Sequence, residues 1–187
     1  NARYQPADWF TLAGQFGFDR AQDNYSTLRD RGARSTANNP AWANGAIFEG
    51  SGDEQSLNSQ LSASARRTFG DLETTLNGQY LYNLRENSGI DLEGLNLVVP
   101  GLYTADAATE GFDVASDRQQ IREVGLLAGL NLAYKGRYIL DGAMRHDGSS
   151  LFGPDNRWQT FGRTSGTWIA SEEPWWFAPR ALSLFKL

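Results

Sequence analysis

His146, Asp147 and Ser149 lie within one short run and are the residue types of a hydrolytic triad. A triad needs a base that an orienting group holds on a rigid scaffold. Three residues of one turn do not provide such a scaffold, so we reject this interpretation. We expect instead that Asp147-Gly148-Ser149-Ser150 forms a tight loop, in which the Asp and Ser side chains bond to backbone amides.

The acidic residues suggest two further kinds of chemistry, proton transfer and calcium binding. Glu172 and Glu173 are adjacent, and adjacent residues of a strand point to opposite faces. We therefore expect a solvated turn at a strand end and no shared proton. Other acidic pairs lie in segments that we interpret as loops, and none follows the calcium-loop pattern. These pairs are Asp53 with Glu54, Asp91 with Glu93, and Asp106 with Glu110.

The composition excludes several classes of site. The 187 residues include no cysteine and one histidine, and the formal net charge is −5. Without cysteine there is no thiol nucleophile, no cysteine-based zinc site and no iron–sulfur cluster. No basic stripe is present to neutralise phosphates, so we expect no nucleic-acid partner. We predict no catalytic residue, no metal and no cofactor, and we do not expect an enzyme.

Aromatic side chains could contact a sugar or another ligand. Trp175 and Trp176 could stack on a sugar ring, but they lie beside a predicted short turn, where anchoring at a membrane interface is favoured. Tyr103 and Phe112 lie in a predicted long loop and are better candidates for contact with a ligand.

The elements that must position these residues are strands, because the recurring pattern has a period of two. The clearest case is Leu72–Arg85, in which one face carries Leu76 and Tyr80 and the other carries Asn77 and Gln79. The same alternation predicts strands over further segments. These are Trp9–Arg20, Leu57–Phe69, Gly125–Tyr134, Arg137–His146 and Trp158–Ile169, with Ala181–Leu187 as the opening of one more.

The predicted connections alternate between short and long. Arg67–Asp71 and Tyr134–Arg137 are typical of tight hairpin turns, whereas Arg20–Leu57 and Glu86–Arg118 would be long loops. Short turns, long loops and strands with one apolar face are typical of outer-membrane β-barrels. The predicted fold is therefore all-β, an antiparallel up-and-down transmembrane segment of about seven to eight strands. Aromatic residues beside the short turns fit the interfacial girdle of such a barrel.

The strand count indicates a segment of a larger barrel. The first strand would be a stub at Ala2–Gln5, and the last would break off at Leu187. A partial barrel leaves open edges, whose backbone groups find no partner in a bilayer. We therefore interpret residues 1–187 as part of one barrel domain, with a signal peptide, a plug domain and further strands outside this chain.

In such a barrel the polar faces would line a wet interior. There they would meet a plug or a passing solute, or simply satisfy each other across the strands. The side chains that we expect to face this lumen are Gln79, Arg85, Arg137, Asp141 and Arg145.

The last third of the chain resembles the SusC/RagA family of TonB-dependent outer-membrane transporters. The motif residues that carry the resemblance are Tyr134, Tyr138, Arg145, Asp147, Gly148, Ser149, Ser150, Phe152, Gly153, Trp168 and Glu173, followed by the run from Leu182 to Leu187. Two departures from the family pattern are Phe161-Gly162-Arg163, where Phe-Pro-Ser is common, and Phe185 within the final run.

The resemblance implies a 22-stranded barrel in the bacterial outer membrane that imports oligosaccharides or peptides. It also implies three partners, namely the lipid bilayer, a SusD-like surface lipoprotein and the TonB complex. The barrel wall would do no bond chemistry in this scheme.

Two rival interpretations remain at this point. A soluble all-β binding module, either a sandwich or a lipocalin-like barrel, would turn the same apolar faces inward as a core. A surface enzyme would need a convergent acid–base or metal constellation, which the sequence lacks.

Overall fold

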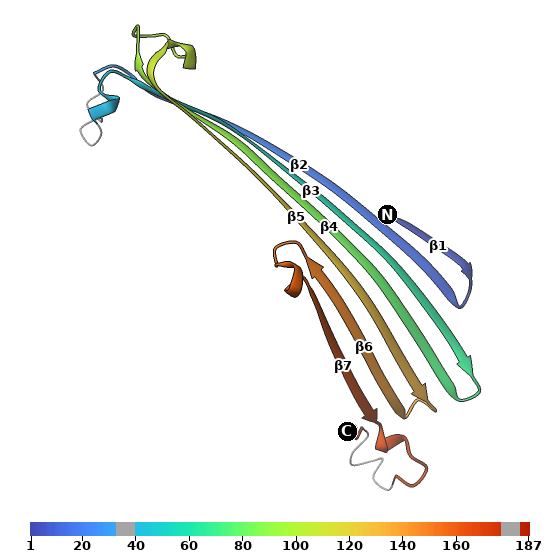
Figure 1. Ribbon diagram of the computed structural model, residues 1–187. Helices are drawn as coiled ribbons and strands as arrows, with labels where there is room; N and C mark the ends of the chain where they lie inside the picture. The colour runs from blue at the N-terminus through green and yellow to red at the C-terminus, as the bar shows by residue number, and fades with distance from the viewer. Residues whose placement is uncertain (33–39, 177–183) are drawn as a thin grey trace. The chain divides into compact units, whose positions relative to one another are not determined.

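The computed structural model describes residues 1–32, 40–176 and 184–187. Its seven strands form one sheet in which sequence neighbours are also spatial neighbours, in the order β1 to β7 (Figure 1). The strands are β1 (Ala2–Ala7), β2 (Phe10–Arg29), β3 (Ala46–Phe69), β4 (Leu72–Leu97), β5 (Ala108–Tyr134), β6 (Tyr138–Ser149) and β7 (Trp158–Trp168). The predicted fold class, an antiparallel up-and-down all-β segment, is confirmed.

Helical structure in the described residues is confined to single 3₁₀ turns. They are η2 (Pro40–Trp42), η3 (Ala105–Ala107), η4 (Pro154–Asn156) and η5 (Ala170–Glu172). Within the described ranges, no helix is long and apolar enough to span a bilayer.

The chain divides into two units. The first unit comprises Asn1–Gly17, Leu57–Leu84 and Ile121–Leu187. The second comprises Phe18–Ser56 and Arg85–Gln120. Strands β2 to β5 each contribute residues to both units, whereas β1, β6 and β7 belong to the first.

The first unit holds the short turns. Gly70 (φ 61°) lies between β3 and β4, and Lys135 (φ 53°) and Gly136 (φ 68°) lie between β5 and β6. Left-handed backbone of this kind matches the twist of the flanking strands in a tight hairpin. Both predicted hairpin turns are therefore confirmed.

The register of the first unit separates an apolar face from a polar one. Leu132 pairs with Leu140, and the next pair, Asn131 with Asp141, points to the other side of the sheet. On the apolar face the large side chains are exposed, including Leu76 at 54%, Leu130 at 39% and Leu140 at 52%. These residues do not meet in a sealed core, which the soluble alternative requires.

The second unit has a small apolar core of its own. Ile47, Leu97, Ala107 and Ala108 are buried together, with Leu28 packed against them. The main chain closes around this core, because Leu97 N donates to Asn44 O (3.1 Å) and Val98 N donates to Ala107 O (2.9 Å). The core thus fixes the ends of β3, β4 and β5 within the second unit.

The predicted long loops were largely wrong. Within Arg20–Leu57, β2 continues to Arg29 and β3 already begins at Ala46. Within Glu86–Arg118, β4 continues to Leu97 and β5 begins at Ala108. Polar residues occupy both faces of these strands, so the sequence shows no alternation there and is easily taken for loop.

Both ends of the chain differ slightly from expectation. The stub predicted at Ala2–Gln5 is the six-residue strand β1, which pairs with β2. At the other end, Lys186 forms an antiparallel bridge with Ile169, and Leu187 N donates to Trp168 O at 2.9 Å. Within residues 184–187 the predicted strand opening is limited to this single bridge, and residues 181–183 lie outside the described residues.

Candidate functional site

The polar face of the first unit is hollowed beside the end of β6. Strand pairing brings the lining together, because Arg145 lies opposite Phe161 and Asp147 lies opposite Gln159. On the other side of β6, Asp147 pairs with Gly125 of β5. Other lining residues are Leu81, Asn83, Glu123, Val124, Gly148, Ser149, Phe152 and Arg157.

The Arg145–Asp147 ion pair and the glycine at position 125 lie at the base of this hollow. Arg145 Nε donates to the Asp147 carboxylate, with N–O distances of 2.9 and 2.7 Å to its two oxygens. A β-carbon on Gly125 would lie 3.0 Å from Asp147 Oδ1 and 3.4 Å from Leu81 Cβ. Glycine therefore leaves room for the carboxylate to lie against the sheet.

The run after β6 forms the rim. Ser150 exchanges two hydrogen bonds with Arg122, through Ser150 N to Arg122 O (2.9 Å) and Arg122 N to Ser150 Oγ (2.8 Å). Leu151 N donates to Ser149 Oγ at 3.4 Å, and Gly153 precedes η4. These contacts hold Phe152 at the edge of the hollow.

The expected tight loop at Asp147–Ser150 was wrong in its first three residues. Asp147, Gly148 and Ser149 lie within β6, and the turn begins at Ser150. The Asp147 carboxylate contacts the Arg145 guanidinium, whereas we had expected it to accept from backbone amides. The reason is that Arg145, two residues away on the same face of the strand, offers a charged donor.

The geometry also excludes a triad of His146, Asp147 and Ser149. His146 lies on the opposite face of β6 from Asp147. There it stacks on Trp158 (centroid distance 4.9 Å, interplanar angle 5°), and its Nδ1 lies 2.8 Å from Thr160 Oγ1. Among the described residues, no group of three His, Cys, Asp or Glu side chains could hold a metal.

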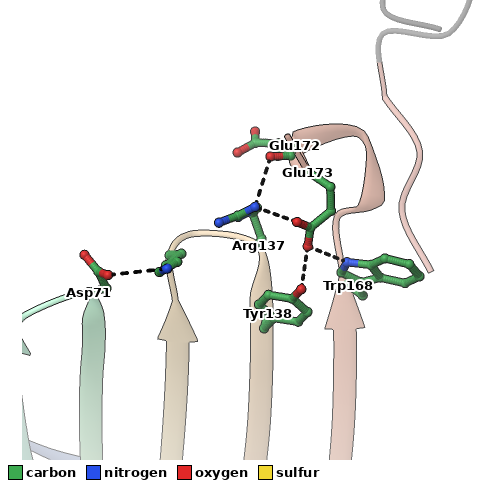
Figure 2. Close-up of polar contacts among 7 residues, drawn as sticks. Asp71, Arg137, Tyr138, Trp168, Glu172 and Glu173 are labelled. Atoms are coloured by element: carbon green, nitrogen blue, oxygen red, sulfur yellow. Dashed lines mark hydrogen bonds and ion pairs between the residues drawn. The ribbon is translucent and has the colours of Figure 1, made fainter. Parts of the chain in front are cut away.

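A second cluster is centred on Glu173, just beyond β7 (Figure 2). Its carboxylate accepts hydrogen bonds from Arg137 Nη1 (2.6 Å), Tyr138 OH (2.5 Å) and Trp168 Nε1 (3.1 Å). Its side chain is only 8% exposed. The expected solvated turn is therefore wrong for Glu173, because η5 folds the carboxylate back onto three donors.

These hydrogen bonds act on the ionisation of the cluster. The Tyr138 hydroxyl contributes most to holding the pKa of Glu173 below its ordinary value, and Trp168 and Arg137 add to the effect. Partial desolvation opposes them. The arrangement favours the charged carboxylate and ties the residue after η5 to the start of β6 and the end of β7.

The other residues that we expect to face the lumen do not line this hollow. Asp141 accepts from Asn131 Nδ2 at 2.6 Å across the β5–β6 pair. Gln79 lies in β4 of the first unit, whereas Arg85 is the first β4 residue of the second. Arg137 lies in the turn before β6 and belongs to the Glu173 cluster.

The sequence analysis missed the part of the hollow contributed by neighbouring strands. Glu123, Arg157, Gln159 and Phe161 line it but were not singled out. The available signal was register, since the hairpin at Lys135-Gly136 sets which β5 residues lie opposite Arg145 and Asp147.

The fold and its two-faced sheet define the class, which is the wall of an antiparallel up-and-down β-barrel. Solved structures with this fold include the RagAB peptide transporter and the RagAB peptide importer in its "closed-closed" and "open-open" states, with TM-scores of 0.77, 0.77 and 0.76. The resemblance to the SusC/RagA family is thus confirmed at the level of the fold.

The sequence similarity to these structures is low. Identity is 18% in each case, over 89%, 89% and 94% of this chain. The chain spans about a fifth of the length of the transporter chains, with 19%, 18% and 19% covered. No family model matches the chain, and no curated protein matches it significantly.

Proposed function

We propose that residues 1–187 form part of the β-barrel domain of a TonB-dependent outer-membrane importer of the SusC/RagA kind. The observation that carries this proposal is the exposed apolar face of the first unit, which includes Leu76, Leu130 and Leu140. Contiguous apolar surface of this extent is rare on soluble monomers. Hydrocarbon would cover this face, and the polar face with Asp141 and Arg145 would look into the pore.

Peptides are the solute that we favour over oligosaccharides, because the RagAB peptide transporter is among the solved structures with this fold. A SusD-like lipoprotein and the TonB complex would act through other parts of the protein. The chain would supply wall and extracellular surface, and its residues would carry out no bond chemistry.

The facing assignment can be tested with two adjacent substitutions in the intact protein that carries this segment. Leu76→Arg would place a charge in hydrocarbon and cost roughly 2–4 kcal/mol near the bilayer midplane, with less nearer the interface. Asn77→Arg, one residue along on the other face of β4, would point into water and be tolerated. Each variant is folded into lipid vesicles. Heat-modifiable gel mobility then measures the folded fraction, and urea unfolding measures the stability.

Equal tolerance of the two arginines would contradict the assignment of the faces. A greater loss of stability from Asn77→Arg than from Leu76→Arg would reverse it. The soluble binding module would then become the better proposal, since its apolar face would be an interior.

A further inference from the structure

The Arg145 side chain is held by Asp147 through Nε alone, which leaves its two Nη groups for another partner. Its Nε is bound by Asp147, and the side chain remains 54% exposed. Within the part of the chain that the structure describes, its two Nη groups form no hydrogen bond or ion pair. A guanidinium held through Nε still presents its Nη1–Nη2 edge, which matches the two oxygens of a carboxylate.

The rest of the hollow adds apolar surface, a second cation and, at Glu123, a second carboxylate. Phe152 and Phe161 line it and are 51% and 56% exposed, so their rings are available to an incoming group. Arg157 lines the same hollow. The space over Gly125 is taken by the Asp147 carboxylate and Leu81, which keeps Asp147 beside Arg145.

From this juxtaposition we propose that the hollow is a binding subsite for a carboxylate that lies next to an apolar side chain. The C-terminal residue of a peptide and an acidic side chain beside an apolar one share this chemistry. Arg145 would bind the carboxylate through both Nη groups, and Arg157 would add positive charge. The rings of Phe152 and Phe161 would pack against the apolar group. The inference deepens the proposed function and rests on it, because the polar face must look into the pore.

The test measures binding by the purified intact protein in detergent. The probe is a fluorescent N-acetylated tripeptide that ends in leucine, prepared with a free C-terminal carboxylate or as the amide. A third probe carries glutamate before an amidated leucine. We expect amidation of the first peptide to weaken binding about tenfold, because a charge-assisted bidentate pair is lost. If the glutamate probe binds as tightly as the peptide with the free C-terminal carboxylate, the subsite accepts acidic side chains as well as chain termini.

Variants connect this preference to the hollow. Arg145→Gln abolishes the preference for the carboxylate, and Arg145→Lys loses most of it because an ammonium lacks the planar fork. Arg163→Gln is the control. Arg163 lies on the same face of β7 as Phe161 but does not line the hollow, so this variant retains the preference for the carboxylate. Heat-modifiable mobility confirms that each variant is folded.

Three outcomes would overturn the proposal. They are equal binding of acid and amide by the unaltered protein, an unchanged preference in Arg145→Gln, and no binding of any probe. If a segment of the same protein fills the hollow, Arg145→Gln lowers the urea midpoint and the probes do not bind. Carboxylate-selective binding without uptake by cells would instead contradict the proposed transport and leave the subsite standing.

Discussion

Glu173 shows how much one carboxylate can organise. It accepts hydrogen bonds from Arg137 in the turn before β6, from Tyr138 at the start of β6 and from Trp168 at the end of β7. Arg137 also approaches the main-chain oxygen of Glu172 at 3.5 Å. Because the donors come from separate segments, this one side chain ties a turn to two strand ends.

The lowered pKa of Glu173 predicts a pH dependence. Its folded-state pKa lies below the ordinary value of 4.5. The carboxylate therefore stabilises the fold fully above about pH 4.5, and this stabilisation is lost as the pH falls through the folded-state pKa. Urea unfolding of the intact protein in vesicles, from about pH 7 to about pH 3, should show a midpoint that drops in this acid range. Glu173→Gln should lower the midpoint at neutral pH and flatten the drop.

Glu172→Gln is the matched control, because Glu172 is adjacent and exposed. It should leave both the neutral midpoint and its acid dependence unchanged. A Glu173→Gln variant that unfolds with the same pH profile as the unaltered protein would show that the cluster does not stabilise the folded state.

Among the elements, the strands of the second unit rest on a very small core. Of their large side chains, Ile47 and Leu97 are the fully buried ones within the described ranges, at 0% and 1% exposure. Gly45, with φ 92°, passes so close to Leu97 that a β-carbon there would lie 3.0 Å from its side chain. Backbone hydrogen bonding must supply most of the remaining order.

Leu97→Ala should therefore destabilise this unit strongly. Truncating a buried leucine costs about 2–5 kcal/mol, and the cost rises with the cavity that remains. Hydrogen exchange of the intact protein, followed by mass spectrometry over Asn96–Ala108, measures the loss of protection. Val99→Ala, at a position 49% exposed, should change protection by less than about 0.5 kcal/mol. Equal effects from the two variants would contradict the role assigned to the core.

The sequence predicted those elements whose two faces differ. Alternation located the strands of the first unit, and glycine chemistry located the turns at Gly70 and Gly136. Strands with polar residues on both faces, such as Arg85–Leu97, carry no such signal, so the sequence predicts a loop there. The surroundings of Glu173 and the far wall of the hollow depend on register and on η5, which local pattern does not encode.

At the scale of the whole molecule, the exposed apolar face sets the solvent requirement. Side chains such as Phe16, Met144 and Phe69 are 64%, 57% and 60% exposed. We expect the purified protein to be monodisperse in detergent and to aggregate when detergent is removed, which size-exclusion chromatography with light scattering measures. A monodisperse sample with a cooperative melt in plain buffer would instead favour a soluble all-β module.

The paired main chain of the second unit has an evolutionary consequence. Among the described residues of this unit, the buried side chains larger than alanine are one isoleucine and one leucine, so selection for folding constrains few large side chains. Mutations there can accumulate without unfolding the protein. Such strands offer a surface whose recognition properties can be rewritten in descendants while the architecture is inherited unchanged.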